Sequence, residues 1–96
     1  MKTKKEIIKT IEENKNKIKN FGVKKIGLFG SYLKNKQTKK SDIDFIVEFN
    51  IPSFDNYADL LILLEKIFGK KIDLITFESL RPELNYIKNE VEYARV

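Results

Sequence analysis

Residues 28–49 read LFGSYLKNKQTKKSDIDFIVEF, and this segment joins two apolar stretches through a polar, lysine-rich connection. The first stretch closes a strand predicted from Lys24 to Phe29, which stops at Gly30. The second is a strand predicted from Ile43 to Phe49. Its alternate residues are apolar and share one face of a sheet: Ile43, Phe45, Val47 and Phe49. Because Gly30-Ser31 turns the chain into a short connection, we expect the two strands to run antiparallel.

The flanking sequence supplies helices and one further strand. Thr3 and Glu6 match a capping box, and apolar residues at helical spacing predict a first helix from about Lys4 to Asn20. The other predicted elements are an apolar helix from Tyr57 to Phe68 closed by Gly69, a strand from Lys71 to Thr76, and a helix that starts at Arg81-Pro82-Glu83. This order predicts the α/β (α+β) class, with a small mixed sheet of about three strands flanked by helices in a single domain, residues 1–96.

The composition excludes several kinds of chemistry. The chain has no cysteine and no histidine, which removes disulfides, thiolate zinc sites, cysteine nucleophiles and histidine acid–base catalysis. A formal charge of +5 suits a polyanionic partner such as a triphosphate or a nucleic acid, although a lysine excess can have other origins. The amino terminus lacks the apolar stretch of a signal peptide, so we expect a cytoplasmic protein.

Three aspartates are predicted to converge at one edge of the sheet. Asp42 and Asp44 are two residues apart in an extended segment, so their carboxylates project to the same side. The strand with Asp73 follows a crossover helix, which makes it a parallel neighbour and brings Asp73 close to Asp44. A pair of magnesium ions about 4 Å apart would neutralise these charges and stabilise an in-line phosphoryl-type displacement. Taken alone, Asp73 fits better as a solvent-facing residue of an edge strand, and the joint occurrence reverses that preference.

The Gly30-Ser31 pair is a candidate phosphate-binding turn. Glycine lets the backbone approach a phosphate closely, and Ser31 offers amide and hydroxyl donors. On its own, such a pair is usually only a turn. The lysines at positions 34, 36, 39 and 40 are explained as well by a solvated loop as by a role beside phosphate. The tyrosines at positions 32, 57, 86 and 93 are more often packing residues than platforms for a base.

Together these residues resemble the nucleotidyltransferase superfamily that includes the DNA polymerase beta palm, and specifically its minimal stand-alone members, often encoded beside a HEPN-domain toxin. The family pattern is a glycine-serine pair after a strand, then two carboxylates separated by one apolar residue, then a third carboxylate on a later strand. The resemblance implies a polymerase beta-like fold in which Asp42, Asp44 and Asp73 bind Mg²⁺. It also implies that Asp73 activates the acceptor hydroxyl.

The resemblance further implies that Gly30, Ser31 and Lys34 bind the donor nucleotide, which we expect to be ATP. Members commonly continue the glycine-serine pair with an aromatic residue, alanine, arginine and glycine. This chain has Tyr32, Leu33, Lys34 and Asn35 at those positions. Lysine keeps the positive charge of the arginine but lacks its planar two-pronged donor.

The leading hypothesis is magnesium-dependent transfer of AMP from ATP to a protein hydroxyl. The resemblance implies that the acceptor belongs to a cognate HEPN toxin, with tyrosine expected, and that the chain is an antitoxin. Three alternatives stay open. They are transfer to a small-molecule hydroxyl, for which relatives generally have an additional domain; a noncatalytic antitoxin that neutralises its partner by binding; and a basic nucleic-acid-binding domain.

Overall fold

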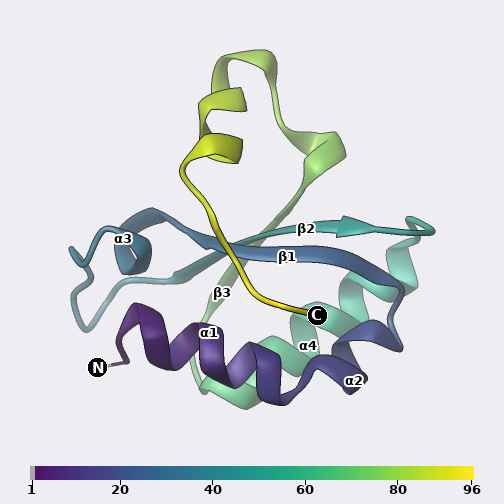
Figure 1. Cartoon of the computed structure of the whole chain (residues 1–96), viewed down its shortest axis with the longest axis horizontal. Coiled ribbons are helices and arrows are strands. Elements are labelled where there is room, and N and C mark those ends of the chain that lie inside the picture. Colours follow the sequence, from purple (N-terminus) through teal and green to yellow (C-terminus); the bar gives the residue numbers. More distant parts are fainter. Residues whose placement is uncertain (1) are drawn as a thin grey trace.

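The computed structural model describes residues 2–96, without the side chains at positions 84, 85 and 88. Within this range the chain forms a four-stranded sheet in the order β3-β2-β1-β4, and Figure 1 labels β1, β2 and β3. The strands are β1 (Val23–Phe29), β2 (Ile43–Phe49), β3 (Ile72–Thr76) and β4 (Glu92–Tyr93). The predicted mixed α+β class is confirmed, but the sheet has one short strand more than the three expected.

The pairing of the strands agrees with the predictions from connection length. β1 and β2 are antiparallel, as expected for strands joined by a short connection. β2 and β3 are parallel, as expected for strands joined through a crossover helix. β4 adds antiparallel to the free side of β1, where Gly27 pairs with Tyr93. The strands that carry the candidate carboxylates are therefore neighbours in the middle and at one edge of the sheet.

Three helices cover one face of the sheet (Figure 1): α1 (Lys4–Glu13), α2 (Lys15–Lys19) and α4 (Phe54–Phe68). The capping box at the start of α1 is present, because Thr3 and Glu6 each accept a hydrogen bond from the other's backbone N–H. The predicted single helix from Lys4 to Asn20 is wrong, since the chain leaves helical geometry at Asn14. The side-chain amide of Asn14 donates a hydrogen bond to the Thr10 carbonyl at 2.9 Å. A side chain that competes in this way for backbone hydrogen bonds disfavours the interior of a helix.

The core lies between the sheet and these helices. Alternation along β2 is confirmed, because Ile43, Phe45 and Val47 are fully buried on the helix side of the sheet. Phe45 packs against Phe68 of α4, with their ring centroids 5.8 Å apart. Gly69 ends α4 in the left-handed conformation predicted for it (φ 61°). No helix in residues 2–96 has the length and apolar character needed to cross a membrane.

The C-terminal part lies over the opposite face of the sheet (Figure 1). Two 3-10 helices, η1 (Phe77–Ser79) and η2 (Pro82–Asn89), follow β3, so the helix predicted from Arg81-Pro82-Glu83 starts as expected but is not an α-helix. The chain then crosses β1 at Gly27, where an added Cβ would lie 2.2 Å from Val91 Cγ1. The missing side chain at Gly27 thus lets the C-terminal segment pack onto β1. A short α3 (Gly30–Leu33) follows β1 at the edge where the candidate carboxylates lie.

Candidate active site

Asp44 and Asp73 form the centre of the candidate site. They are register partners on the parallel strands β2 and β3, which places their backbones about 4.8 Å apart. Asp44 lies between the buried Ile43 and Phe45, so its side chain points to the face away from α4. On its other side, Asp44 pairs with Phe29, the last residue of β1. The predicted proximity of these two carboxylates to the end of β1 is therefore confirmed.

Burial, together with the neighbouring carboxyl groups, raises the pKa of Asp44 from 3.8 to about 6. Burial is the largest cause, followed by the negative charge of Asp73, a hydrogen bond between the two carboxyl groups and the charge of Asp42. A hydrogen bond donated by the Ser31 backbone acts in the opposite direction. Two full negative charges are unfavourable here, so the pair is most stable with a shared proton or a bound cation.

Gly30 lies directly against the carboxylate of Asp44. An added Cβ at position 30 would lie 2.1 Å from Asp44 Oδ2 and 2.9 Å from its Cγ, and the backbone has a φ of 76°. Only glycine satisfies both conditions without strain. We predicted that Gly30 allows a phosphate to approach the backbone, and in the structure the group that approaches it is the Asp44 side chain. The Ser31 amide likewise faces Asp44, which places both residues at the carboxylate pair.

The carboxylates have the donor chemistry of a site for Mg²⁺, which prefers oxygen ligands and commonly uses one or two carboxylates together with substrate phosphates. Among the residues that the structure describes, no group of three acidic side chains is assembled closely enough to hold a metal ion. Asp44 and Asp73 are close, and Asp42 contributes only a smaller electrostatic effect on Asp44. The two-residue pair fits a cation that also binds a triphosphate, and Asp42 stays a predicted third ligand.

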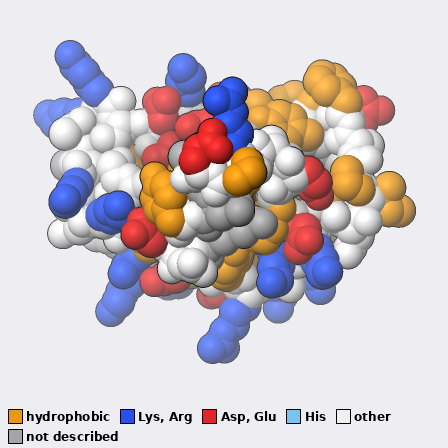
Figure 2. All heavy atoms as spheres, turned by 90° about the horizontal axis from the view of Figure 1, so that it is seen from above, with side chains coloured by type: hydrophobic (Ala, Val, Ile, Leu, Met, Phe, Trp, Pro, Cys, Tyr) orange, Lys and Arg blue, Asp and Glu red, His pale blue; other side chains and the backbone are white. Residues whose placement is uncertain are grey.

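Lys34 lines a recess together with Gly30 and is paired with Glu90. Its ammonium group is 3.4 Å from Glu90, and about half of each side chain is exposed. Lys36 and Lys40 are exposed on the connection between α3 and β2. On the face seen in Figure 2, basic and acidic side chains are interspersed instead of forming one continuous basic patch. The face in this view therefore has no continuous basic patch of the kind expected at a nucleic-acid-binding surface.

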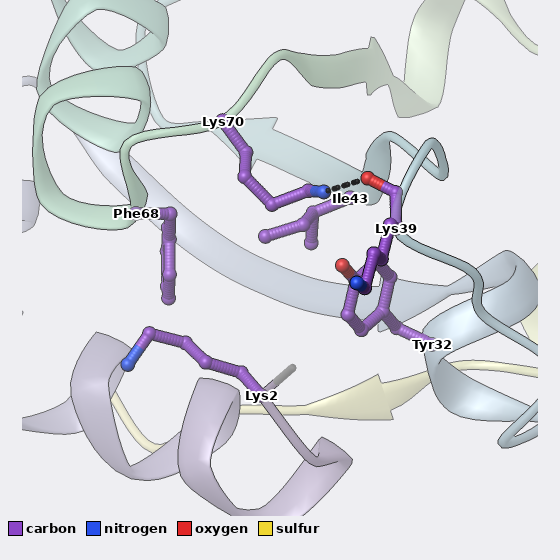
Figure 3. Close-up of a pocket in the computed structure, with 6 residues that line it drawn as sticks. All are labelled: Lys2, Tyr32, Lys39, Ile43, Phe68 and Lys70. Atoms are coloured by element: carbon purple, nitrogen blue, oxygen red, sulfur yellow. Dashed lines mark hydrogen bonds between the residues drawn. The ribbon is translucent and has the colours of Figure 1, made fainter.

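Lys39 lines a different cavity, of about 440 Å³, together with Lys2 and Lys70 (Figure 3). Lys70 Nζ donates a hydrogen bond to the Lys39 carbonyl at 3.1 Å across the rim of this cavity. The side chain of Ile43 forms part of the wall, and side chains alternate along a strand, so this cavity lies on the opposite side of β2 from Asp44. It is larger than a second recess that is lined in part by Gly30, and none of Asp42, Asp44 and Asp73 lines either of them.

The contribution of η2 could not be found from the sequence. Tyr86, Ile87 and Glu90 line a recess together with Phe29, Gly30 and Lys34, more than fifty positions earlier in the chain. Tyr86 had been interpreted as a packing residue, yet 55% of it is exposed. The sequence does contain a pattern in this segment, because apolar residues recur at helical spacing after Pro82. That pattern predicted an α-helix and gave no indication that the segment lines the site.

Comparison with known proteins shows the family to which the chain belongs. The profile of the family described as nucleotidyltransferase domain matches residues 5–96. A candidate protein adenylyltransferase of Methanocaldococcus jannaschii is 46% identical over 96 aligned residues, which cover 96% of this chain and 94% of that protein. The protein adenylyltransferase MntA of Thermococcus cleftensis is 36% identical over 83 residues, with 84% of each chain covered.

Solved structures share the fold at lower identity. A structure described as a minimal nucleotidyltransferase superposes with a TM-score of 0.74 at 22% identity, covering 88% of this chain and 93% of the other. A toxin–antitoxin structure with AMP-PNP gives 0.67 at 23% identity, with 85% and 70% covered. A tri-AMPylated Shewanella oneidensis HEPN toxin in complex with its MNT antitoxin gives 0.62 at 20% identity, with 90% and 70% covered.

Proposed function

This chain belongs to the nucleotidyltransferase family and is a nucleotidyltransferase, and from that premise we propose that it transfers AMP from ATP to a protein hydroxyl. We propose as acceptor a tyrosine of a HEPN-domain toxin, with the chain acting as its antitoxin. The observation that carries the proposal is the Asp44–Asp73 pair held against Gly30 at one edge of the sheet.

The identity of the acceptor is supported by the relatives. Proteins that are 46% and 36% identical to this chain are named as protein adenylyltransferases, which favours a protein over a small molecule. Chains of the same fold occur in a toxin–antitoxin structure with AMP-PNP and in a complex with an AMPylated HEPN toxin. A docked protein would also supply a wall for the exposed site and hold its own hydroxyl in position.

The proposed transfer requires a group that accepts the proton of the hydroxyl and ligands for divalent cations, and the residues of the site can serve as both. The acceptor oxygen must bond to the α-phosphorus of ATP as the bond from that phosphorus to the pyrophosphate oxygen breaks, and the hydroxyl proton must leave. Asp73 is exposed beside Asp44 and would accept that proton. Asp44 and Asp42, with Asp73, would hold the divalent cations. When bound, these ions neutralise charge on the attacking and leaving oxygens.

A transfer assay with purified proteins tests the proposal. The chain is incubated with α-labelled ATP, Mg²⁺ and a cognate HEPN-domain protein, and the mass of the partner is measured. We expect one or more AMP units on a partner tyrosine with the wild type, and none in EDTA. Asp44→Asn should abolish transfer, whereas Asp59→Asn, a matched change at an exposed position of α4, should not.

The same assay separates the alternatives. Protection of cells from the toxin by Asp44→Asn as strongly as by the wild type, without any AMP on the toxin, would show neutralisation by binding alone. Label that appears in a small molecule and never in the partner would show a different acceptor class. Either result would refute protein adenylylation as the function of this chain.

A further inference from the structure

A recess of about 170 Å³ opens beside Gly30, the residue whose backbone lies against the Asp44 carboxylate. Its walls come from two separate parts of the chain. They are Phe29, Gly30 and Lys34 at the end of β1 and in α3, and Tyr86, Ile87 and Glu90 in and after η2. Gly30 therefore contacts Asp44 and also lines the recess, so the recess adjoins the position of a ligand bound at Asp44.

We propose that this recess binds the base of the donor nucleotide and that Tyr86 is the platform on which the base stacks. The inference rests on the proposed function, because it needs the phosphates at Asp44 and Gly30. A nucleotide with its phosphates at Asp44 and Gly30 extends past the Gly30-Ser31 turn, so its base lies to one side of that turn. The recess is the adjoining hollow, and apolar groups of Phe29, Tyr86 and Ile87 line it.

Tyr86 differs from the other three tyrosines, each of which is buried or bonded to another part of the described chain. Tyr32 is 1% exposed in the core, the Tyr57 hydroxyl donates to the Leu74 carbonyl at 2.5 Å, and Tyr93 contacts the Phe77 ring. For Tyr86, neither a hydrogen bond nor a ring contact occurs within the described residues, and 55% of the residue is exposed. An exposed aromatic ring at the wall of a recess offers its face to a planar ligand.

The polar groups of the recess suit a base with an amino group. Glu90, which faces Lys34 across 3.4 Å, accepts hydrogen bonds but does not donate them when ionised. Adenine presents an exocyclic amino group that can donate to such a carboxylate, whereas the corresponding position of uracil is a carbonyl oxygen. The recess therefore prefers ATP to UTP, and the preference depends on Glu90.

Calorimetric binding in the presence of Mg²⁺, without an acceptor protein, tests the base site. Two ligands are compared: ATP and inorganic tripolyphosphate, which has the phosphates but no base. Tyr86→Ala should weaken ATP binding between about 5-fold and about 150-fold, the range expected for loss of one base–aromatic stack, and leave tripolyphosphate binding unchanged. Tyr86→Phe should retain the affinity for ATP.

Two controls make the result specific. Phe54→Ala removes an aromatic side chain that is 81% exposed and outside the recess, and it should change neither affinity. Glu90→Gln should reduce the preference for ATP over UTP. ATP affinity that is equal in the wild type and Tyr86→Ala would overturn the base site while leaving the proposed function intact. A wild type that binds neither ATP nor tripolyphosphate would instead overturn the proposed function and, with it, this inference.

Discussion

Replacement of Asp44 by asparagine should stabilise the protein in the absence of metal while it removes the activity. Asp44 is partly buried beside Asp73 and against the backbone of Gly30, and burial followed by the charge of Asp73 raises its pKa from 3.8 to about 6. A group whose pKa is higher in the folded state binds its proton more tightly there than in the unfolded chain. Stability is therefore lost as the pH rises from about 4 to about 6, and the loss is complete above that range.

The size of the effect follows from that shift. At about 1.4 kcal/mol per pKa unit, a rise from 3.8 to about 6 corresponds to roughly 3 kcal/mol. Asp44 is only partly buried, so screening by solvent reduces this to about 1–2 kcal/mol. In a domain of this size, each kcal/mol changes the melting temperature by about 4–8 °C. The neutral asparagine keeps the shape of the side chain and avoids this cost.

Thermal unfolding in EDTA from pH 4 to pH 8 measures the difference. Asp44→Asn should melt at nearly the wild-type temperature at pH 4 and several degrees above the wild type at pH 7 and higher. Added Mg²⁺ should then raise the wild-type melting temperature more than that of the variant, because the variant lacks one charged ligand. Asp59→Asn should follow the wild type at every pH. A difference in melting temperature between the wild type and Asp44→Asn that stays constant from pH 4 to pH 8 would refute the claim that ionisation of Asp44 destabilises the folded protein.

Two further substitutions test the geometry and the chemistry. Gly30→Ala should destabilise the protein by about 1–3 kcal/mol more than Gly69→Ala in urea unfolding, because both positions have positive φ but only the Cβ at position 30 meets Asp44. Equal losses of stability in these two variants would contradict the contact. Asp73→Asn should lower the single-turnover rate of transfer by about 10²- to 10⁴-fold, as expected for loss of a general base, while ATP affinity changes much less. A proportional loss of ATP affinity in calorimetry would instead assign Asp73 to nucleotide binding alone.

Local patterns in the sequence determined the framework of the fold. The alternation of apolar residues along β2 determines which side chains enter the core. Because Asp44 lies between two of these residues, its side chain lies on the opposite face of the sheet. The lengths of the two connections determined that β1 runs antiparallel and β3 parallel to β2, which brings Asp73 beside Asp44. Gly69 predicted the end of α4 because a left-handed residue favours glycine. These features depend on neighbouring residues or on simple chain connectivity.

Only the tertiary structure decided how the site is enclosed. The contact of Gly30 with Asp44 and the packing of Val91 over Gly27 join residues far apart in the chain, and no local period encodes them. The 3-10 geometry of η2 and the addition of β4 to β1 likewise depend on how the C-terminal segment packs across the sheet. Tyr86 reaches the recess beside Gly30 by that path. The sequence alone therefore determined which carboxylates meet, and the packing of the C-terminal segment determined what lies beside them.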